Sequence, residues 1–166
     1  ANHHTMTISG GKITSNETGA EGGGIWNEGT LTMSNFIVNL NTARDAAGIW
    51  NEGTINMKGG NIVNNETSEA GAGGIANQSN ATLNIDGCYV SGNTGKLDGC
   101  GIWSAGKLSM KGTITIWGNH DNNEKNNNLF LDGEAVIDVT GAITTGSKIG
   151  VSIAHPGRVF TKGYKS

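Results

Sequence analysis

Short stretches in which apolar and polar residues alternate recur along most of the chain. Residues 24–33 return as residues 48–57 with two substitutions. Looser copies begin at residues 74 and 101, and a fainter one begins at residue 128. A repeat of about 24 residues is typical of solenoid proteins, in which each repeat forms one coil that stacks on the next.

The alternating stretches have the two-residue period of β-strands, as in residues 30–33, and none has the 3.6-residue spacing of an amphipathic helix. Glycine and asparagine clusters separate them. We therefore predict an all-β fold, a right-handed parallel β-helix (solenoid) of about five coils, over residues 1–140. Right-handedness follows from the family resemblance described below and from general chirality arguments. Residues 141–166 are predicted to form a strand-rich cap or to lead into a following domain.

Residues at equal positions of successive coils should form columns, because stacked strands lie about 4.8 Å apart. Four columns are apolar and are predicted to fill the interior: Ile25, Ile49, Ile75, Ile102 and Leu129; Met6, Leu31, Ile55, Leu83 and Leu108; Ile8, Met33, Met57, Ile85 and Met110; Ile13, Val38, Ile62, Val90 and Ile116. A fifth column is predicted to be an asparagine ladder in which the amides bond along the stack and tolerate left-handed backbone: Asn16, Asn41, Asn65, Asn93 and Asn119.

Composition supports one repeat domain and excludes several partners. The 166 residues include 28 glycines and one proline, and only 15% are charged, against about 25% in an ordinary domain. A formal net charge of −3 gives no basic surface for nucleic acid, and no apolar run is long enough for membrane insertion. Because the first partial copy, at residues 5–8, starts within a coil, we expect the chain to be a fragment of a larger protein.

Short motifs within the repeats resemble those of a known family. Residues 23–26 and 73–76 have the Gly-Gly-apolar-apolar pattern, and residues 36–39 the Phe-x-x-Asn pattern, of polymorphic outer-membrane-protein repeats. The chain thus resembles adhesin-like right-handed β-helix proteins of bacterial surfaces over residues 5–140. It departs from them where Ala47 and Cys100 replace the first glycine. The resemblance implies an extracellular or cell-surface location, a role in structural display and adhesion, and no catalytic residue.

One outward column is aromatic, since its members follow the inward residues of the first apolar column: Trp26, Trp50, Trp103 and Phe130, interrupted by Ala76. Exposed aromatic side chains in a row are a platform on which sugars stack, so we take these four as the candidate binding face for a glycan or host-matrix ligand. In the alternative interpretation, the rings pack on one another or beneath a neighbouring domain of the same chain.

Two glutamates raise the question of enzyme activity. Glu28 and Glu52 occupy equal positions in adjacent coils, as a carboxylate pair in a polysaccharide hydrolase or lyase would. The simpler interpretation is that they are solvated turn residues of a duplicated sequence. We therefore expect no enzyme activity, no cofactor and no metal site, with a carbohydrate-active domain as the alternative. Outward threonines such as Thr30 and Thr32 leave ice binding as a further alternative.

The two cysteines, Cys88 and Cys100, lie in adjacent predicted coils. Their sequence positions are compatible both with a disulfide and with two buried thiols that fill corners, and neither has a histidine in a recognisable catalytic relation. The polar segment at residues 120–128 is predicted to be a protruding loop.

Overall fold

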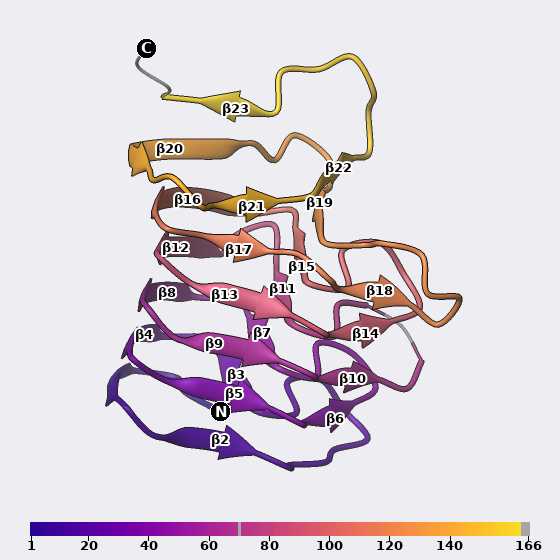
Figure 1. Cartoon of the computed structure of the whole chain (residues 1–166). Coiled ribbons are helices and arrows are strands. Elements are labelled where there is room, and N and C mark those ends of the chain that lie inside the picture. Colours follow the sequence, from indigo (N-terminus) through magenta and orange to yellow (C-terminus); the bar gives the residue numbers. More distant parts are fainter. Residues whose placement is uncertain (70, 164–166) are drawn as a thin grey trace.

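Short strands of alternating residues stack in parallel, in register, into a β-solenoid of about six turns, against the five predicted. The computed structural model describes residues 1–69 and 71–163, and within these ranges every strand ladder is parallel. Figure 1 shows the chain winding upward from β1 and β2 to β23. No described segment forms a helix of the length and apolar character needed to cross a bilayer.

The strands form four sheets, three around the body of the solenoid and one beside it. The seven-stranded sheet contains β1 (Thr5–Ser9), β4 (Thr30–Ser34), β8 (Thr54–Lys58), β12 (Thr82–Asp86), β16 (Lys107–Gly112), β20 (Ile137–Ile143) and β23 (Thr161–Lys162). The tryptophan sheet contains β3 (Ile25–Asn27), β7 (Ile49–Asn51), β11 (Ile75–Asn77), β15 (Ile102–Ser104), β19 (Leu129–Leu131) and β22 (Val151–Ile153).

The third body sheet, here called the tyrosine sheet, contains β2 (Lys12–Thr14), β5 (Ile37–Asn39), β9 (Asn61–Val63), β13 (Tyr89–Ser91), β17 (Thr115–Ile116) and β21 (Lys148–Ile149). The arm is the four-stranded sheet of β6 (Thr42–Ala43), β10 (Glu66–Thr67), β14 (Thr94–Gly95) and β18 (His120–Asp121). In Figure 1 the arm projects to one side of the body. Each of the four turns that begin at β3, β7, β11 and β15 visits the tryptophan sheet, the seven-stranded sheet, the tyrosine sheet and the arm in that order.

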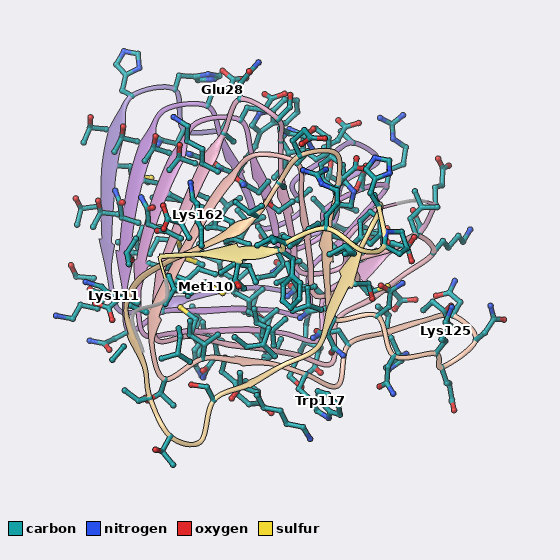
Figure 2. All side chains as sticks on the ribbon, turned by 90° about the horizontal axis from the view of Figure 1, so that it is seen from above. Glu28, Met110, Lys111, Trp117, Lys125 and Lys162 are labelled. Atoms are coloured by element: carbon teal, nitrogen blue, oxygen red, sulfur yellow. The ribbon has the colours of Figure 1, made fainter. Side chains whose placement is uncertain are left out.

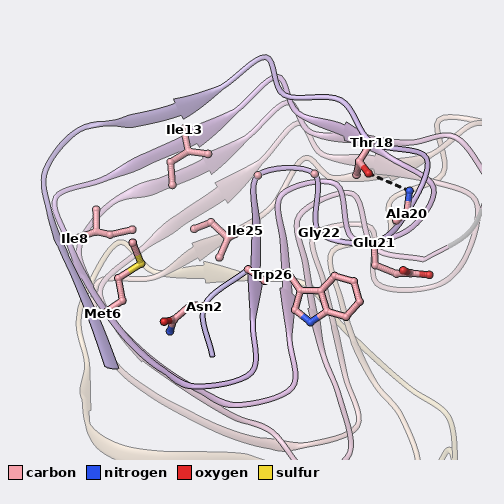
Figure 3. Close-up of a pocket in the computed structure, with 13 residues that line it drawn as sticks. Asn2, Met6, Ile8, Ile13, Thr18, Ala20, Glu21, Gly22, Ile25 and Trp26 are labelled. Atoms are coloured by element: carbon pink, nitrogen blue, oxygen red, sulfur yellow. Dashed lines mark hydrogen bonds between the residues drawn. The ribbon is translucent and has the colours of Figure 1, made fainter. Parts of the chain in front are cut away.

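The four apolar columns predicted from the sequence form the core. Strand register pairs their members directly, as in Ile49 with Ile75 and Leu31 with Ile55, and most are fully buried. The first turn is the exception, because β1, β2 and β3 are edge strands of their sheets: Met6 is 48% exposed. Met6, Ile8, Ile13 and Ile25 line an open cavity of about 440 Å³ at this end of the stack (Figure 3).

The predicted asparagine ladder is confirmed. Each amide nitrogen donates to the amide oxygen one turn higher, with distances of 2.8 Å from Asn16 to Asn41 and 2.9 Å from Asn41 to Asn65. The ladder continues through Asn93 to Asn119. The expected left-handed backbone lies one residue earlier than predicted, at the residue before each ladder asparagine: Ser15, Leu40, Asn64, Gly92 and Gly118.

A second ladder was not predicted. It runs along the end of the tryptophan sheet, where Asn27 donates to Asn51 and Asn51 to Asn77, each at 2.8 Å, and Asn77 donates to the Ser104 hydroxyl. Asn2 donates into its lower end. The repeated Ile-Trp-Asn triplet contained the signal for this ladder. Side chains alternate between the two faces of a strand, so the asparagine lies on the same inward face as the isoleucine two residues earlier.

The segment predicted to be a protruding loop differs in detail from its prediction. Residues 120–128 are not simply a loop, since β18 extends the arm and Asn127 and Asn128 are buried; only the tip around Lys125 projects outward (Figure 2). In the predicted cap, β21, β22 and β23 add a strand to each body sheet. Its last residues, 164–166, lie outside the described part of the chain.

We predict that Asn65→Ala lowers the free energy of unfolding by about 2–4 kcal/mol, because it leaves buried donors of Asn41 without an acceptor. The Asn65 amide oxygen accepts from both the backbone and side-chain nitrogens of Asn41, and its nitrogen donates to Asn93 and Val38. Urea unfolding measures the change. The control Asn61→Ala, at an exposed position of the same turn, should cost less than about 0.5 kcal/mol; equal losses would contradict a special role for the ladder.

Candidate functional site

The candidate site is the inner corner between the tryptophan sheet and the arm. After each ladder asparagine the chain runs out along an arm strand, turns, and returns to the tryptophan sheet, as in residues 42–48 between Asn41 and β7. The returning segments form one wall of the corner, and the outward side chains of the tryptophan sheet form the other. Figure 3 shows Trp26 and Glu21 at the first of these corners.

The structure brings the four predicted aromatic residues into one column. Strand register pairs Trp26 with Trp50, and Trp103 with Phe130, with Ala76 between the two pairs. The ring centroids of Trp26 and Trp50 lie 6.4 Å apart with the planes tilted by 57°, within the range in which aromatic pairs attract. The column geometry is therefore as predicted.

The aromatic column is half-buried rather than fully outward. Trp50 and Trp103 pack against a small alanine cluster, Ala46, Ala72 and Ala76, of which Ala46 and Ala72 belong to the returning segments. Ala76 is itself only 2% exposed, so the interruption in the row is covered rather than open. The column thus packs within its own chain and still keeps part of each ring at the surface.

The two lower indoles differ in their hydrogen bonds. Trp26 Nε1 donates to Glu52 Oε2 at 3.2 Å, which fixes the orientation of this ring. Trp50 Nε1 is buried and has no acceptor among the described residues, whereas a buried indole N–H usually finds one. The Trp50 ring packs against the alanine cluster.

Carboxylates give the corner an acidic character. Glu21 pairs with Arg44, whose guanidinium lowers the pKa of that carboxyl. Asp45, bridged to Glu21 in the next turn, is half-buried. Desolvation raises the Asp45 pKa, the charge of Glu21 adds to the rise, and the Ala46 N–H and Arg44 oppose it.

Glu28 and Glu52, the pair considered for catalysis, contact different groups. The Glu28 carboxylate is paired with the ring Nδ1 of His3, and the Glu52 carboxylate accepts from the indole N–H of Trp26. Both side chains are exposed. The structure therefore gives each glutamate a separate neighbour on the surface, and no hydrogen bond joins their carboxyl groups in the described residues.

Both cysteines are buried free thiols, which decides between the two alternatives left by the sequence. Burial raises the pKa of Cys88 to about 12, with a smaller contribution from the charge of Asp86. Burial likewise raises the pKa of Cys100 to about 11. Residues 1–69 and 71–163 hold no cluster of three His, Cys, Asp or Glu side chains suited to a metal ion.

No family model matches the chain, and searches of curated proteins and of solved structures returned no match either. The strand ladders alone establish the fold. The resemblance to bacterial surface repeats rests on the short motifs in and before β3, β5 and β11.

We predict that neither thiol reacts readily in the folded protein, because the thiolate is the reactive form and a raised pKa depletes it. Alkylation of Cys88 and Cys100 by iodoacetamide at pH 8 should be at least about 100-fold slower than in guanidinium chloride. Mass spectrometry after timed quenching gives both rates. A variant with an added exposed thiol, Thr113→Cys, supplies the control, and native labelling at the rate of that control would contradict burial.

We predict that Asp45→Asn raises the melting temperature at pH 7 by about 1–2 °C. A raised pKa means that the folded state disfavours the ionised form of Asp45. The contribution of Asp45 to stability is therefore fully present below its pKa in the unfolded chain, and it is lost as the pH rises through its pKa in the folded protein. Asparagine removes this charge and still accepts from the Ala46 N–H. The gain should disappear at pH 3, where Asp45 is protonated. Asp98→Asn, in an exposed arm turn, is the matched control, and a gain that persists at pH 3 would contradict the explanation.

Proposed function

We propose that this chain is a stiff structural segment of a secreted or cell-surface bacterial protein that acts in adhesion. Support for stiffness comes from continuous backbone ladders in all three body sheets and from two side-chain ladders that tie successive turns. In a stack of this kind each repeat contacts only the repeats directly below and above it. The length and direction of the segment therefore follow from the way successive repeats stack. The resemblance to adhesin-like surface repeats supports the location.

We infer that the ligand contacts lie at the tryptophan corner. The observation that carries this proposal is the tilted contact pair Trp26 and Trp50: both rings are half-exposed, and Glu52 orients Trp26. A ring held in one orientation can stack on the apolar face of a sugar without first losing rotational freedom. Because Asp45 and Glu52 border the corner and form no ion pair among the described residues, an uncharged glycan suits it better than an acidic one.

We predict that Trp26→Ala weakens binding of a neutral oligosaccharide at least tenfold. A panel of neutral glycans, screened on an array and followed by titration calorimetry of any hit, measures this effect. Trp26 is the suitable position, because Trp50 and Trp103 pack the alanine cluster and their removal would disturb the fold.

The control is Trp117→Ala, an exposed tryptophan on another sheet, which should leave neutral-glycan binding unchanged. Circular dichroism confirms folding of both variants. If no neutral glycan binds, or if both variants bind as the parent does, the tryptophan corner is a packing feature and the proposed ligand site is wrong. Binding of a matrix protein that is lost in Trp26→Ala would keep the site and change the ligand class.

A further inference from the structure

The tyrosine sheet presents a second aromatic surface, away from the tryptophan corner. Its outward positions include Tyr89 on β13 and Trp117, which directly follows β17. Tyr89 is 46% exposed and Trp117 39% exposed. Figure 2, which looks along the stack, places Trp117 and Glu28 on opposite sides of the body. Exposed apolar side chains mark a candidate interaction site when they lie close together, and Tyr89 and Trp117 belong to neighbouring strands of this sheet or directly follow one.

The tyrosine sheet carries lysines and no carboxylates along its strands. Lys12 and Lys148 lie at its two ends, and none of its strand residues is Asp or Glu. Lys148 Nζ lies 3.7 Å from the centroid of the Trp117 ring. An exposed cation–π contact of this kind is weak. The Lys148 ammonium group can therefore leave the Trp117 ring and pair with a carboxylate at a small cost in free energy.

A hollow lies beside Tyr89, where the tyrosine sheet meets the seven-stranded sheet. It measures about 520 Å³ and is lined by Lys58, Asn61, Asp86, Tyr89 and Thr115, among others, over a floor of corner glycines. Asp86 is paired with Lys111 at 3.4 Å, so its charge is balanced.

Two lysines along this surface have no carboxylate partner. Neither Lys58 nor Lys148 forms an ion pair with any residue in the described ranges. Strand register places Asn61, Tyr89, Thr115 and Lys148 in one column. Three strand spacings separate the first and last of these positions, about 14 Å. Lys58 ends β8, three residues before Asn61, and is paired in register with Asp86. Tyr89 therefore lies between two available cations at a distance that suits several sugar units rather than one.

We propose that this surface, defined by Lys58, Tyr89, Trp117 and Lys148, binds an acidic oligosaccharide whose sugars carry carboxylates. A sugar ring stacks on Tyr89, and the neighbouring strands β9 and β17 supply hydrogen-bonding groups from Asn61 and Thr115. Lys58 and Lys148 pair with carboxylates at the two ends of the oligosaccharide, and Trp117 lies beside Lys148. The surface thus differs from the tryptophan corner in its charge and in the class of glycan it accepts.

The test is titration calorimetry with a hexamer of galacturonic acid, using maltohexaose as the neutral comparison. We expect saturable binding of the acidic hexamer, weakened at least tenfold by Lys148→Gln and by Tyr89→Ala, whereas these two substitutions should leave any binding of maltohexaose at the tryptophan corner unchanged. Raising the salt concentration should weaken it further, since exposed charges are screened. Both residues are exposed, and circular dichroism checks that the variants fold.

Two controls separate this site from the rest of the surface. Lys107→Gln removes an exposed lysine from the seven-stranded sheet, and Trp26→Ala alters the tryptophan corner; neither should change binding of the acidic hexamer. The proposal is overturned if the hexamer does not bind, if maltohexaose binds equally well at this surface, or if Lys107→Gln weakens binding as much as Lys148→Gln. Binding that withstands Tyr89→Ala also overturns it, because attraction between charges alone would then suffice.

Discussion

In-register stacking of buried asparagine amides is the constraint on which the rest of the structure depends. Each ladder amide donates to the asparagine one turn higher and accepts from the one below, so no member has a satisfactory partner if one turn slips. Slippage by one residue would also exchange the inward and outward faces of every strand. The ladders therefore fix the register that makes each column uniform, and the apolar core follows from that register.

A fixed register does not require turns of equal length, because extra residues are placed outside the stack. Residues 52–53 connect β7 to β8, whereas residues 78–81 connect β11 to β12, and the strands on both sides still pair without a shift. The register shift recorded among the ladders lies between β16 and β20, near the upper end. Insertions between ladders thus alter the corners and the arm, which are the surfaces available for ligand contacts.

The sequence predicted the strands, the apolar columns and one asparagine ladder, because a column repeats the same residue type and is visible by alignment of the chain with itself. It could not predict the arm, since the position of residues 42–48 depends on where the backbone bends after Asn41 and not on a residue pattern. That is also why the aromatic column was expected to face solvent: the alanines that cover it, Ala46 and Ala72, come from these returning segments. Tyr89 and Trp117 were missed because they occupy different columns and become neighbours only on the folded sheet.

Net charge is a poor guide to partners in such a fold, because each face collects its own set of outward residues. The chain carries −3 overall. Glu21 lines the cavity at the first tryptophan corner and Asp45 is bridged to it in the next turn, while the tyrosine sheet holds only lysines among its charged strand residues. Recognition of nucleic acid uses an extended basic patch or stripe, and Lys58 and Lys148 are too few for that. Two cations that flank one exposed aromatic ring instead match a short ligand with widely spaced negative charges. The overall negative charge is no obstacle to such a ligand, because Asp86, the carboxylate that lines the hollow beside Tyr89, is paired with Lys111.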